Sequence, residues 1–196
     1  MQFEEVKNTI LSRLENELPG YLSYHTVAHV KDVYHAAELL ATKEGVEGDD
    51  LTLLLTATLF HDSGFMIDQA EHEKSSCGVA EQMLPGYGYT PQQIRRICGM
   101  IMATRIPQTP SNLLEQIICD ADLDYLGRDD FFPIGDTLFA EMRALNIIDT
   151  EDEWNRLQIG FLEKHHYFTA TAIKWRNAKK AENLAIVRSK IKSANV

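Results

Sequence analysis

The amino-acid sequence predicts an all-α protein that folds as one domain over residues 1–196. Apolar residues recur at helical spacing along most of the chain. No segment alternates polar and apolar residues convincingly, and no two such runs flank an Asn-Gly or Asp-Gly turn. A length of 196 residues is sufficient for one compact domain with a substantial core. We therefore expect a single helical bundle.

Three helices are expected before residue 61. The first has apolar residues at helical spacing from residue 3 to residue 14 and stops at a Pro-Gly pair. The second extends over about residues 24–42. The third is capped by Asp49 or Asp50 and contains an unbroken apolar run, LTLLLTATLF, that ends at residue 60. Because this run has no polar face, the third helix should lie in the core.

Proline, glycine and capping residues delimit the later helices. A helix over about residues 71–84 ends at a second Pro-Gly pair, and Thr90 followed by proline is typical of a helix start. Ser111 is the expected cap of the following helix, which reaches Asp122. Three C-terminal helices should complete the shell, over about residues 129–145, 150–165 and 169–190.

The bulk composition is that of a soluble globular protein. Hydrophobic residues make up 44% of the chain, and no stretch reaches the roughly 18 uncharged apolar residues that a membrane span needs. The first ten residues are acidic and amphipathic, unlike a secretory signal. The three cysteines are scattered without CxxC spacing, which is typical of free thiols in a reducing cytoplasm. We therefore expect a cytoplasmic protein with no membrane partner.

The net charge of −10 disfavours a general affinity for nucleic acids, because their phosphates would be repelled. An anionic small molecule is not excluded, since a bound divalent cation can dominate the electric field of its site. The charge is therefore compatible with an anionic small-molecule partner, and no nucleic-acid partner is expected.

The most informative residues are His61 and Asp62, which directly follow the buried run. A buried carboxylate is very costly unless a cation or strong hydrogen bonds compensate its charge. A divalent metal does this well, and the chain supplies further imidazole and carboxylate groups in His25, His29 and Asp122. We therefore expect a metal site between the core helices.

Helical spacing leaves some of these assignments open. His25 and His29 are four residues apart, so one helix would place both on the same face. Asp122 follows Ile118 by four residues and thus shares a face with apolar neighbours. Asp120 also has apolar neighbours on its face, so periodicity does not choose between the two aspartates.

Three elements together resemble the HD superfamily of metal-dependent phosphohydrolases, which is named for a His-Asp doublet. YHTVAH at residues 24–29 resembles the YHxxxH element of the family, LFHD at residues 59–62 its apolar-HD element, and DADL at residues 120–123 its closing aspartate element. The likeness extends from about Tyr24 to Gly127. It implies an HD-domain-like helical bundle with a metal site between core helices.

The resemblance also implies a role for each matched residue. The metal ligands would be His29, His61, Asp62 and Asp122. His25 and Asp62 would be the catalytic residues, with His25 donating a proton to the leaving oxygen or binding phosphate. The usual ligand in this family is the aspartate just before the leucine, which favours Asp122 over Asp120. Asp120 would instead orient a ligand or a water molecule.

Further candidates lie between the matched elements. His72 is the only histidine between the doublet and Asp122, and Thr104 stands where branches with two metals often place a histidine. One metal ion is therefore favoured over two. His72 is a candidate metal ligand or substrate contact, and Lys74 and Arg105 could reach a substrate phosphate.

Two imidazoles and two carboxylates suit one divalent ion, which could be Mn, Mg, Fe, Co, Ni or Zn. Such an ion lowers the pKa of bound water and offsets charge that builds on phosphorus. The predicted function is hydrolysis of a small phosphoester, such as a nucleotide. One alternative is a metal- or ligand-binding regulatory HD module without turnover, and another is a bundle in which the ligands are coincidental. The motifs specify neither the substrate nor the oligomeric state.

Overall fold

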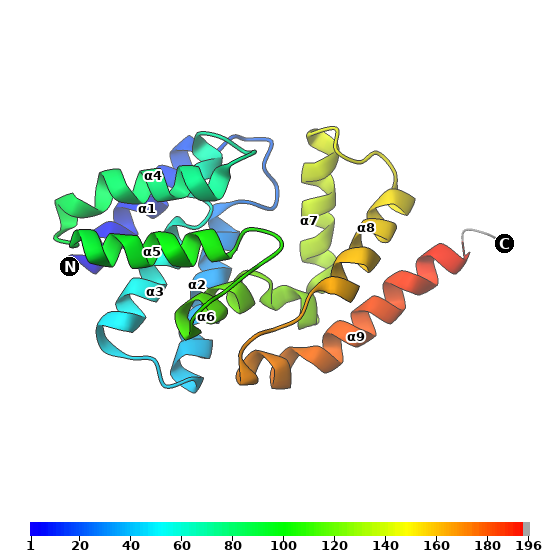
Figure 1. Ribbon diagram of the computed structural model, residues 1–196. Helices are drawn as coiled ribbons and strands as arrows, with labels where there is room; N and C mark the ends of the chain where they lie inside the picture. Colours follow the sequence, from blue (N-terminus) through cyan, green and yellow to red (C-terminus); the bar gives the residue numbers. More distant parts are fainter. Residues whose placement is uncertain (194–196) are drawn as a thin grey trace.

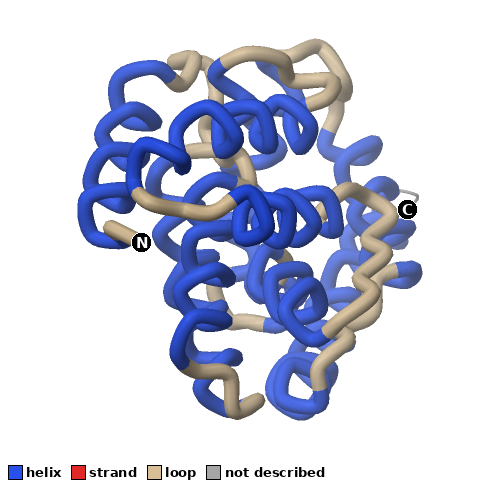
Figure 2. The backbone as a smooth tube through the Cα atoms, turned by 60° about the vertical axis from the view of Figure 1, so that its left-hand side comes forward, coloured by secondary structure: helices blue, strands red, loops and turns tan. Residues whose placement is uncertain are grey.

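The computed structural model describes residues 1–193, without the side chains of residues 192 and 193, and its regular elements are all helical (Figures 1 and 2). The predicted all-α fold is confirmed. Over this part of the chain the elements are α1 (Phe3–Glu17), α2 (Val27–Lys43), α3 (Gly48–Phe60), η1 (Ser63–Met66), α4 (His72–Met83), η2 (Leu84–Tyr87), α5 (Pro91–Ala103), α6 (Leu113–Asp122), η3 (Asp124–Gly127), α7 (Phe131–Ala144), α8 (Glu151–Lys164) and α9 (Ala170–Ser193).

Helix α3 forms the centre of the larger hydrophobic core, as its apolar run predicts. Every residue from Leu53 to Phe60 is buried, because α1, α2, α5 and α6 pack around this helix. Burial of a leucine or phenylalanine side chain stabilises a fold by roughly 1.5–3 kcal/mol. Displacing α3 would expose these side chains, so its position is fixed by packing. The residues that directly follow it, His61 and Asp62, are therefore fixed as well.

Helices α7, α8 and α9 lie together on the other side of the molecule from α1, α4 and α5 (Figure 1). They enclose a second, smaller hydrophobic cluster with η3, in which Leu126, Phe131, Leu162 and Val187 are buried. The expectation of a single domain over residues 1–196 stays a prediction, and its last three residues, 194–196, lie outside the described part. No helix in the described chain has both the length and the apolar character needed to cross a membrane.

Hydrogen bonds and ion pairs join α6 and η3 to the start of α9. The carboxylate of Asp120 accepts the backbone N–H groups of Phe168 and Thr169, at 2.8 Å each. Arg176 of α9 donates to both carboxylate oxygens of Asp124, at 2.6 and 2.9 Å. Asp124 is buried, so this bidentate pair is a strong anchor. The end of α6 is therefore held between the two halves of the molecule.

Three helix starts differ from their predicted positions. Asn112, not Ser111, caps α6, because its side chain accepts the N–H of Glu115 while Ser111 hydrogen-bonds the Glu115 carboxylate. Helix α3 begins at Gly48, so Asp49 and Asp50 occupy its first turn, where carboxylates stabilise the helix dipole.

The third difference concerns α2, which begins at Val27 and thus excludes His25. The backbone of Thr26, directly before α2, is extended, and the N–H groups of Tyr24 and His25 are bonded to a carboxylate of α7. His25 and His29 therefore do not lie on one helical face. The predicted start at Thr90 is confirmed, because Thr90 and Gln93 form a capping box.

Gly127 permits the close approach of η3 to α9. A Cβ atom at this position would lie 2.5 Å from the carbonyl oxygen and from the Cβ atom of Arg176. Because the obstacle is backbone, Gly127→Ala should destabilise the protein by about 1–3 kcal/mol, the usual cost of overpacking. Urea unfolding monitored by circular dichroism measures this change.

Gly160→Ala is the matched control. Gly160 lies within α8, and a Cβ atom there would meet no atom within 4 Å. This variant should gain up to about 1 kcal/mol from the higher helix propensity of alanine. Equal stability of the two variants would show that α9 does not constrain Gly127.

Candidate metal centre

Three side chains from three different helices converge in the interior. His29 lies on α2, His61 at the C-terminal end of α3 and Asp122 at the end of α6. Nε2 of His29 and Nε2 of His61 are 3.4 Å apart, and Oδ1 of Asp122 lies 3.3 and 3.5 Å from them. Their ligand atoms all lie within 4.8 Å of one another, a spacing suited to a shared metal ion.

Asp62 completes this group. Its Oδ2 lies 3.1 Å from Nε2 of His61 and 3.4 Å from Nε2 of His29. Neither contact has hydrogen-bond geometry, and within residues 1–193 this buried oxygen has no hydrogen-bond partner. A buried carboxylate oxygen is costly when unpaired. Asp62 therefore presents an acceptor that a cation could compensate. We call His29, His61, Asp62 and Asp122 the His/Asp cluster.

Local structure fixes the orientation of the doublet. Nδ1 of His61 lies 2.8 Å from the carbonyl oxygen of Thr58, which can only accept, so Nδ1 carries the proton and Nε2 offers a lone pair. The hydroxyl of Ser76 in α4 donates to the carbonyl of His61 and accepts the N–H of Gly64. Adjacent residues can both face the cluster because the chain leaves the α-helix here.

The two carboxylates and the two imidazoles of the cluster shift one another's pKa values, because each carboxylate is stabilised by positive charge. Burial alone lowers the pKa of His29, but the nearby carboxylates of Asp122 and Asp62 outweigh it and raise this pKa to about 8. The pKa of His61 is raised well above its usual value by the same balance. Burial opposes ionisation of Asp122, yet the two imidazoles lower its pKa to about 2. A divalent ion at this place would compensate the same two carboxylates, and it would bind the imidazoles in their neutral form.

Glu141 on α7 is a site residue that sequence reasoning missed. Its buried carboxylate accepts the N–H groups of Tyr24 and His25 at 2.8 and 3.0 Å, and it pairs with Nδ1 of His25. Burial raises the pKa of Glu141, but these bonds outweigh it and hold the pKa below its usual value. The sequence did contain one signal that Glu141 would be buried: it continues the helical spacing of the apolar residues Ile134 and Leu138 along α7.

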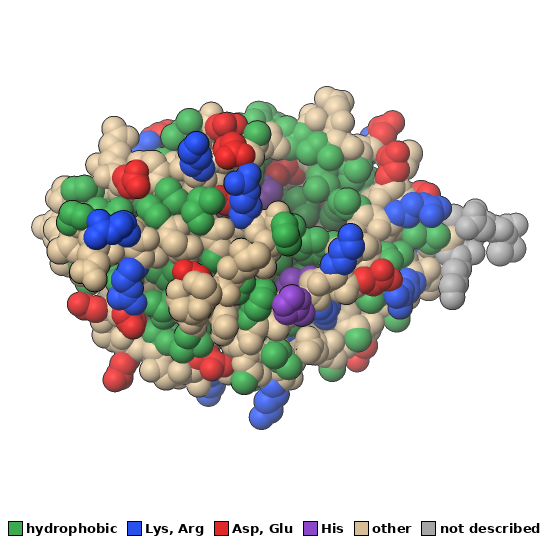
Figure 3. Space-filling model, in the orientation of Figure 1, with side chains coloured by type: hydrophobic (Ala, Val, Ile, Leu, Met, Phe, Trp, Pro, Cys, Tyr) green, Lys and Arg blue, Asp and Glu red, His purple; other side chains and the backbone are tan. Residues whose placement is uncertain are grey.

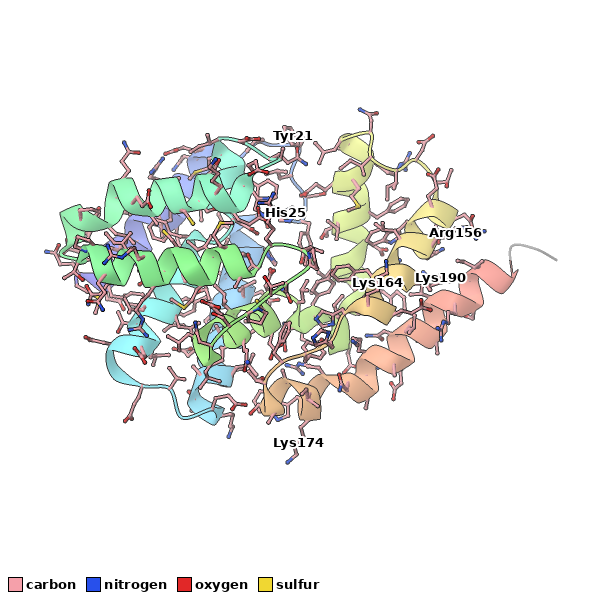
Figure 4. The ribbon with its side chains drawn as sticks, in the orientation of Figure 1. Tyr21, His25, Arg156, Lys164, Lys174 and Lys190 are labelled. Carbon is pink, nitrogen blue, oxygen red and sulfur yellow. The ribbon has the colours of Figure 1, made fainter. Side chains whose placement is uncertain are left out.

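His25 is held between this carboxylate and an aromatic stack. Its ring stacks on Phe65 at a centroid distance of 4.2 Å, and Phe65 stacks on His72 at 4.2 Å. Figure 4 shows His25 in the middle of the molecule, facing the space before α7, whereas Arg156 lies on the outer side of α8. Because Glu141 occupies Nδ1, Nε2 is the ring nitrogen left for another partner.

The other predicted site residues lie outside the cluster. His72 is nearest, with Nε2 3.7 Å from Oδ1 of Asp62 and 3.4 Å from the carboxylate of Glu73. Lys74 is exposed on α4. Arg105 pairs with Glu71 at 2.7 Å, and both side chains are 47% exposed. These two cations therefore lie on the outer surface.

Asp120 faces away from the cluster. Its carboxylate binds the backbone at the start of α9, as described above, and burial raises its pKa to about 6 against the effect of those bonds. The sequence left open which aspartate of DADL joins the histidines. The structure brings Asp122 to them and uses Asp120 to join α6 to α9.

A cavity of about 350 Å³ lies beside the cluster. Its polar lining includes His25, Asp62, His72 and Asp122, and most of the remaining lining is apolar and comes from η3, α7 and α8. Figure 3 shows this hollow with mainly hydrophobic side chains inside it. The volume is within the usual range for small-molecule sites.

No protein-family model matches the sequence, and no curated protein matches it significantly. Three solved structures match the fold over nearly the whole chain. A predicted HD superfamily hydrolase from an uncultured Thermotogales bacterium shares 21% identity at a TM-score of 0.61, over 95% of this chain and 91% of that one. The fold resembles that of an HD-domain hydrolase.

Two further solved structures have a fold similar to that of this chain. Bacillus subtilis YpgQ, solved in complex with ADP, has a TM-score of 0.68 at 15% identity and covers 98% of this chain and 97% of its own. A protein from Lactobacillus plantarum has a TM-score of 0.68 at 19% identity, over 100% of this chain and 97% of its own. At these identities the comparisons show the fold alone.

The two aspartates of DADL should respond differently to substitution. Asp120→Ala should destabilise the protein by about 1–3 kcal/mol, because two buried N–H groups lose their acceptor, and should leave metal content unchanged. Asp122→Ala should lower the metal content of the purified protein. Urea unfolding and mass spectrometry of bound metals measure the two effects. Loss of metal in Asp120→Ala with full stability would assign the ligand to Asp120.

Proposed function

We propose that this protein is a metal-dependent phosphohydrolase that cleaves a small phosphoester. The observation that carries the proposal is the His/Asp cluster, which is buried, lies beside a cavity and contains an unpaired carboxylate oxygen. Two fold comparisons support it, since one similar protein is described as a predicted HD superfamily hydrolase and another was solved with ADP. We propose that the substrate is likewise a small phosphorylated molecule.

The donor set fits a divalent cation. His61 offers Nε2 because Thr58 holds its Nδ1, and Asp62 offers an oxygen that has no other partner. We propose His29, His61, Asp62 and Asp122 as ligands of one ion, which could be Mn, Mg, Fe, Co, Ni or Zn. When bound, such an ion supplies Lewis acidity at a phosphoryl oxygen and lowers the pKa of water. Residues 1–193 contain one such converging group, which favours a single ion.

His25 is the proposed proton donor. Hydrolysis joins a water oxygen to phosphorus and breaks the bond to the ester oxygen, which leaves as an alkoxide and needs a proton. Glu141 holds Nδ1 of His25, so a proton on Nε2 can pass to that oxygen in the cavity. Glu141 acts as a positioning residue, because its bonds to the N–H and to Nδ1 of His25 orient the ring. Asp62 contributes as a proposed ligand that also lines the cavity.

The proposed partner is a small molecule. The expectations of no nucleic-acid partner and of a cytoplasmic location remain predictions. A regulatory HD module without turnover would also keep the His/Asp cluster, so turnover is the property to measure.

Phosphate release tests the proposed function directly. Purified protein is incubated with nucleotides and general phosphoesters, with Mn, Mg, Co, Ni and Zn added separately. Wild type should release phosphate, and His61→Ala-Asp62→Ala should not, because it loses one imidazole and one carboxylate of the cluster. His35→Ala is the control, since this histidine of α2 is 71% exposed and lies outside the site. Bound metal without any release in wild type would favour the regulatory module.

A leaving-group series tests the role of His25. His25→Ala should lower kcat by about 10²–10⁴ for an alkyl phosphoester, whose alkoxide needs a proton. The same variant should change kcat little for a p-nitrophenyl ester, because that leaving group departs without protonation. Glu141→Gln should show a smaller loss with the same dependence on leaving group. An equal loss for both esters in His25→Ala would assign this residue to binding and not to proton donation.

A further inference from the structure

The cavity beside the His/Asp cluster has an unusual charge for a site that binds phosphate. Asp62, Glu73 and Asp122 line it, and no lysine or arginine belongs to its described lining. Its basic side chains are the imidazoles His25 and His72. Arg105, one of the two predicted phosphate contacts, pairs with Glu71 at the outer surface. Phosphate groups beyond the one next to a bound metal would therefore meet no lysine or arginine in the described lining.

The charge balance favours a substrate with a single phosphate. A divalent ion in the cluster would offset the charges of Asp62 and Asp122, and Glu73 would add another negative charge beside it. Each additional phosphate brings further negative charge into this space, and repulsion between like charges is strong in a partly desolvated site. A chain of two or three phosphates therefore has no complementary surface in the cavity.

The rest of the lining is suited to an apolar group. Leu126 of η3, Phe131, Leu138 and Met142 of α7 and Trp154 and Phe161 of α8 form this apolar wall. The hollow lined by hydrophobic side chains is open to view in Figure 3. Transfer of apolar surface from water into such a wall is favourable in proportion to the area buried. A ring or branched hydrocarbon attached to the phosphate would fill this space.

We propose that the substrate is a phosphoester with one phosphate whose organic group is apolar or aromatic and occupies the apolar wall. The inference rests on the proposed function and makes it more specific. It follows from the juxtaposition of an acidic cluster and an apolar wall in one cavity. Nucleoside di- and triphosphates are therefore poor substrates of this protein.

Benzyl phosphate and methyl phosphate give a controlled test, because both leave as primary alkoxides and differ in the apolar group. With Mn²⁺ present, kcat/KM for benzyl phosphate should exceed that for methyl phosphate by about tenfold or more, the amount expected from burial of a phenyl ring. It should also exceed kcat/KM for ATP. Higher activity toward ATP than toward benzyl phosphate would overturn the proposal and leave the phosphohydrolase function intact.

Binding provides a readout that does not depend on turnover. Isothermal titration of the Mn²⁺-loaded protein with benzylphosphonate and methylphosphonate should show at least tenfold tighter binding of the benzyl compound. If no ester is hydrolysed, the phosphohydrolase function is contradicted, whereas the phosphonate comparison still tests the apolar wall. Equal binding of the two phosphonates overturns the present proposal.

A charge introduced at the edge of the cavity tests the same idea within the protein. Leu157 lines the cavity and is 45% exposed, so Leu157→Lys should fold normally. This variant should lower kcat/KM for benzyl phosphate severalfold and raise the relative use of ATP. Ile186→Lys is the matched control, since Ile186 is also 45% exposed but lies on α9 outside the cavity. An identical response of both variants would contradict the proposed role of the apolar wall.

Discussion

Compensation of buried negative charge is the constraint on which this structure depends. Asp62 is buried and Asp122 is partly buried, and carboxylates in such places are tolerated only beside positive charge. Both carboxylates lie within 3.5 Å of Nε2 of His29 on α2 and of His61 at the end of α3. The helices α2, α3 and α6 must therefore meet at this point. Residues 53–60 of helix α3 are buried on every face, so this helix lies within the core. Its C-terminal end places His61 and Asp62 beside His29 and Asp122.

The sequence was sufficient for the helical architecture and for the His-Asp doublet, because both depend on local signals. Apolar periodicity and capping residues predicted the helices to within a few residues, and the buried run indicated that His61 and Asp62 lie in the interior. The choice between Asp120 and Asp122 was not local. It depends on the position of the segment just before α9, because the N–H groups of Phe168 and Thr169 donate to the carboxylate of Asp120.

The role of Glu141 likewise depends on distant parts of the chain. A glutamate in an amphipathic helix is usually exposed, and only the position of α7 beside the segment before α2 makes it a partner of His25. That segment was predicted to be helical, but α2 begins only at Val27, and Glu141 accepts the N–H groups of Tyr24 and His25 before it. Contacts between residues more than a hundred positions apart decide such roles, and the apolar spacing along α7 could indicate only that Glu141 faces the interior.

The His/Asp cluster and the apolar wall come from different parts of the chain. The cluster is built by α2, α3 and α6, whereas most of the wall belongs to α7 and α8. Substitutions at Leu138 or Trp154 could therefore reshape the wall without moving a histidine or aspartate of the cluster. This separation is incomplete at Glu141, which lies on α7 like part of the wall but contacts His25 beside the cluster. In evolution, such a division would let selectivity for the proposed organic group diverge among descendants while the His/Asp cluster is retained.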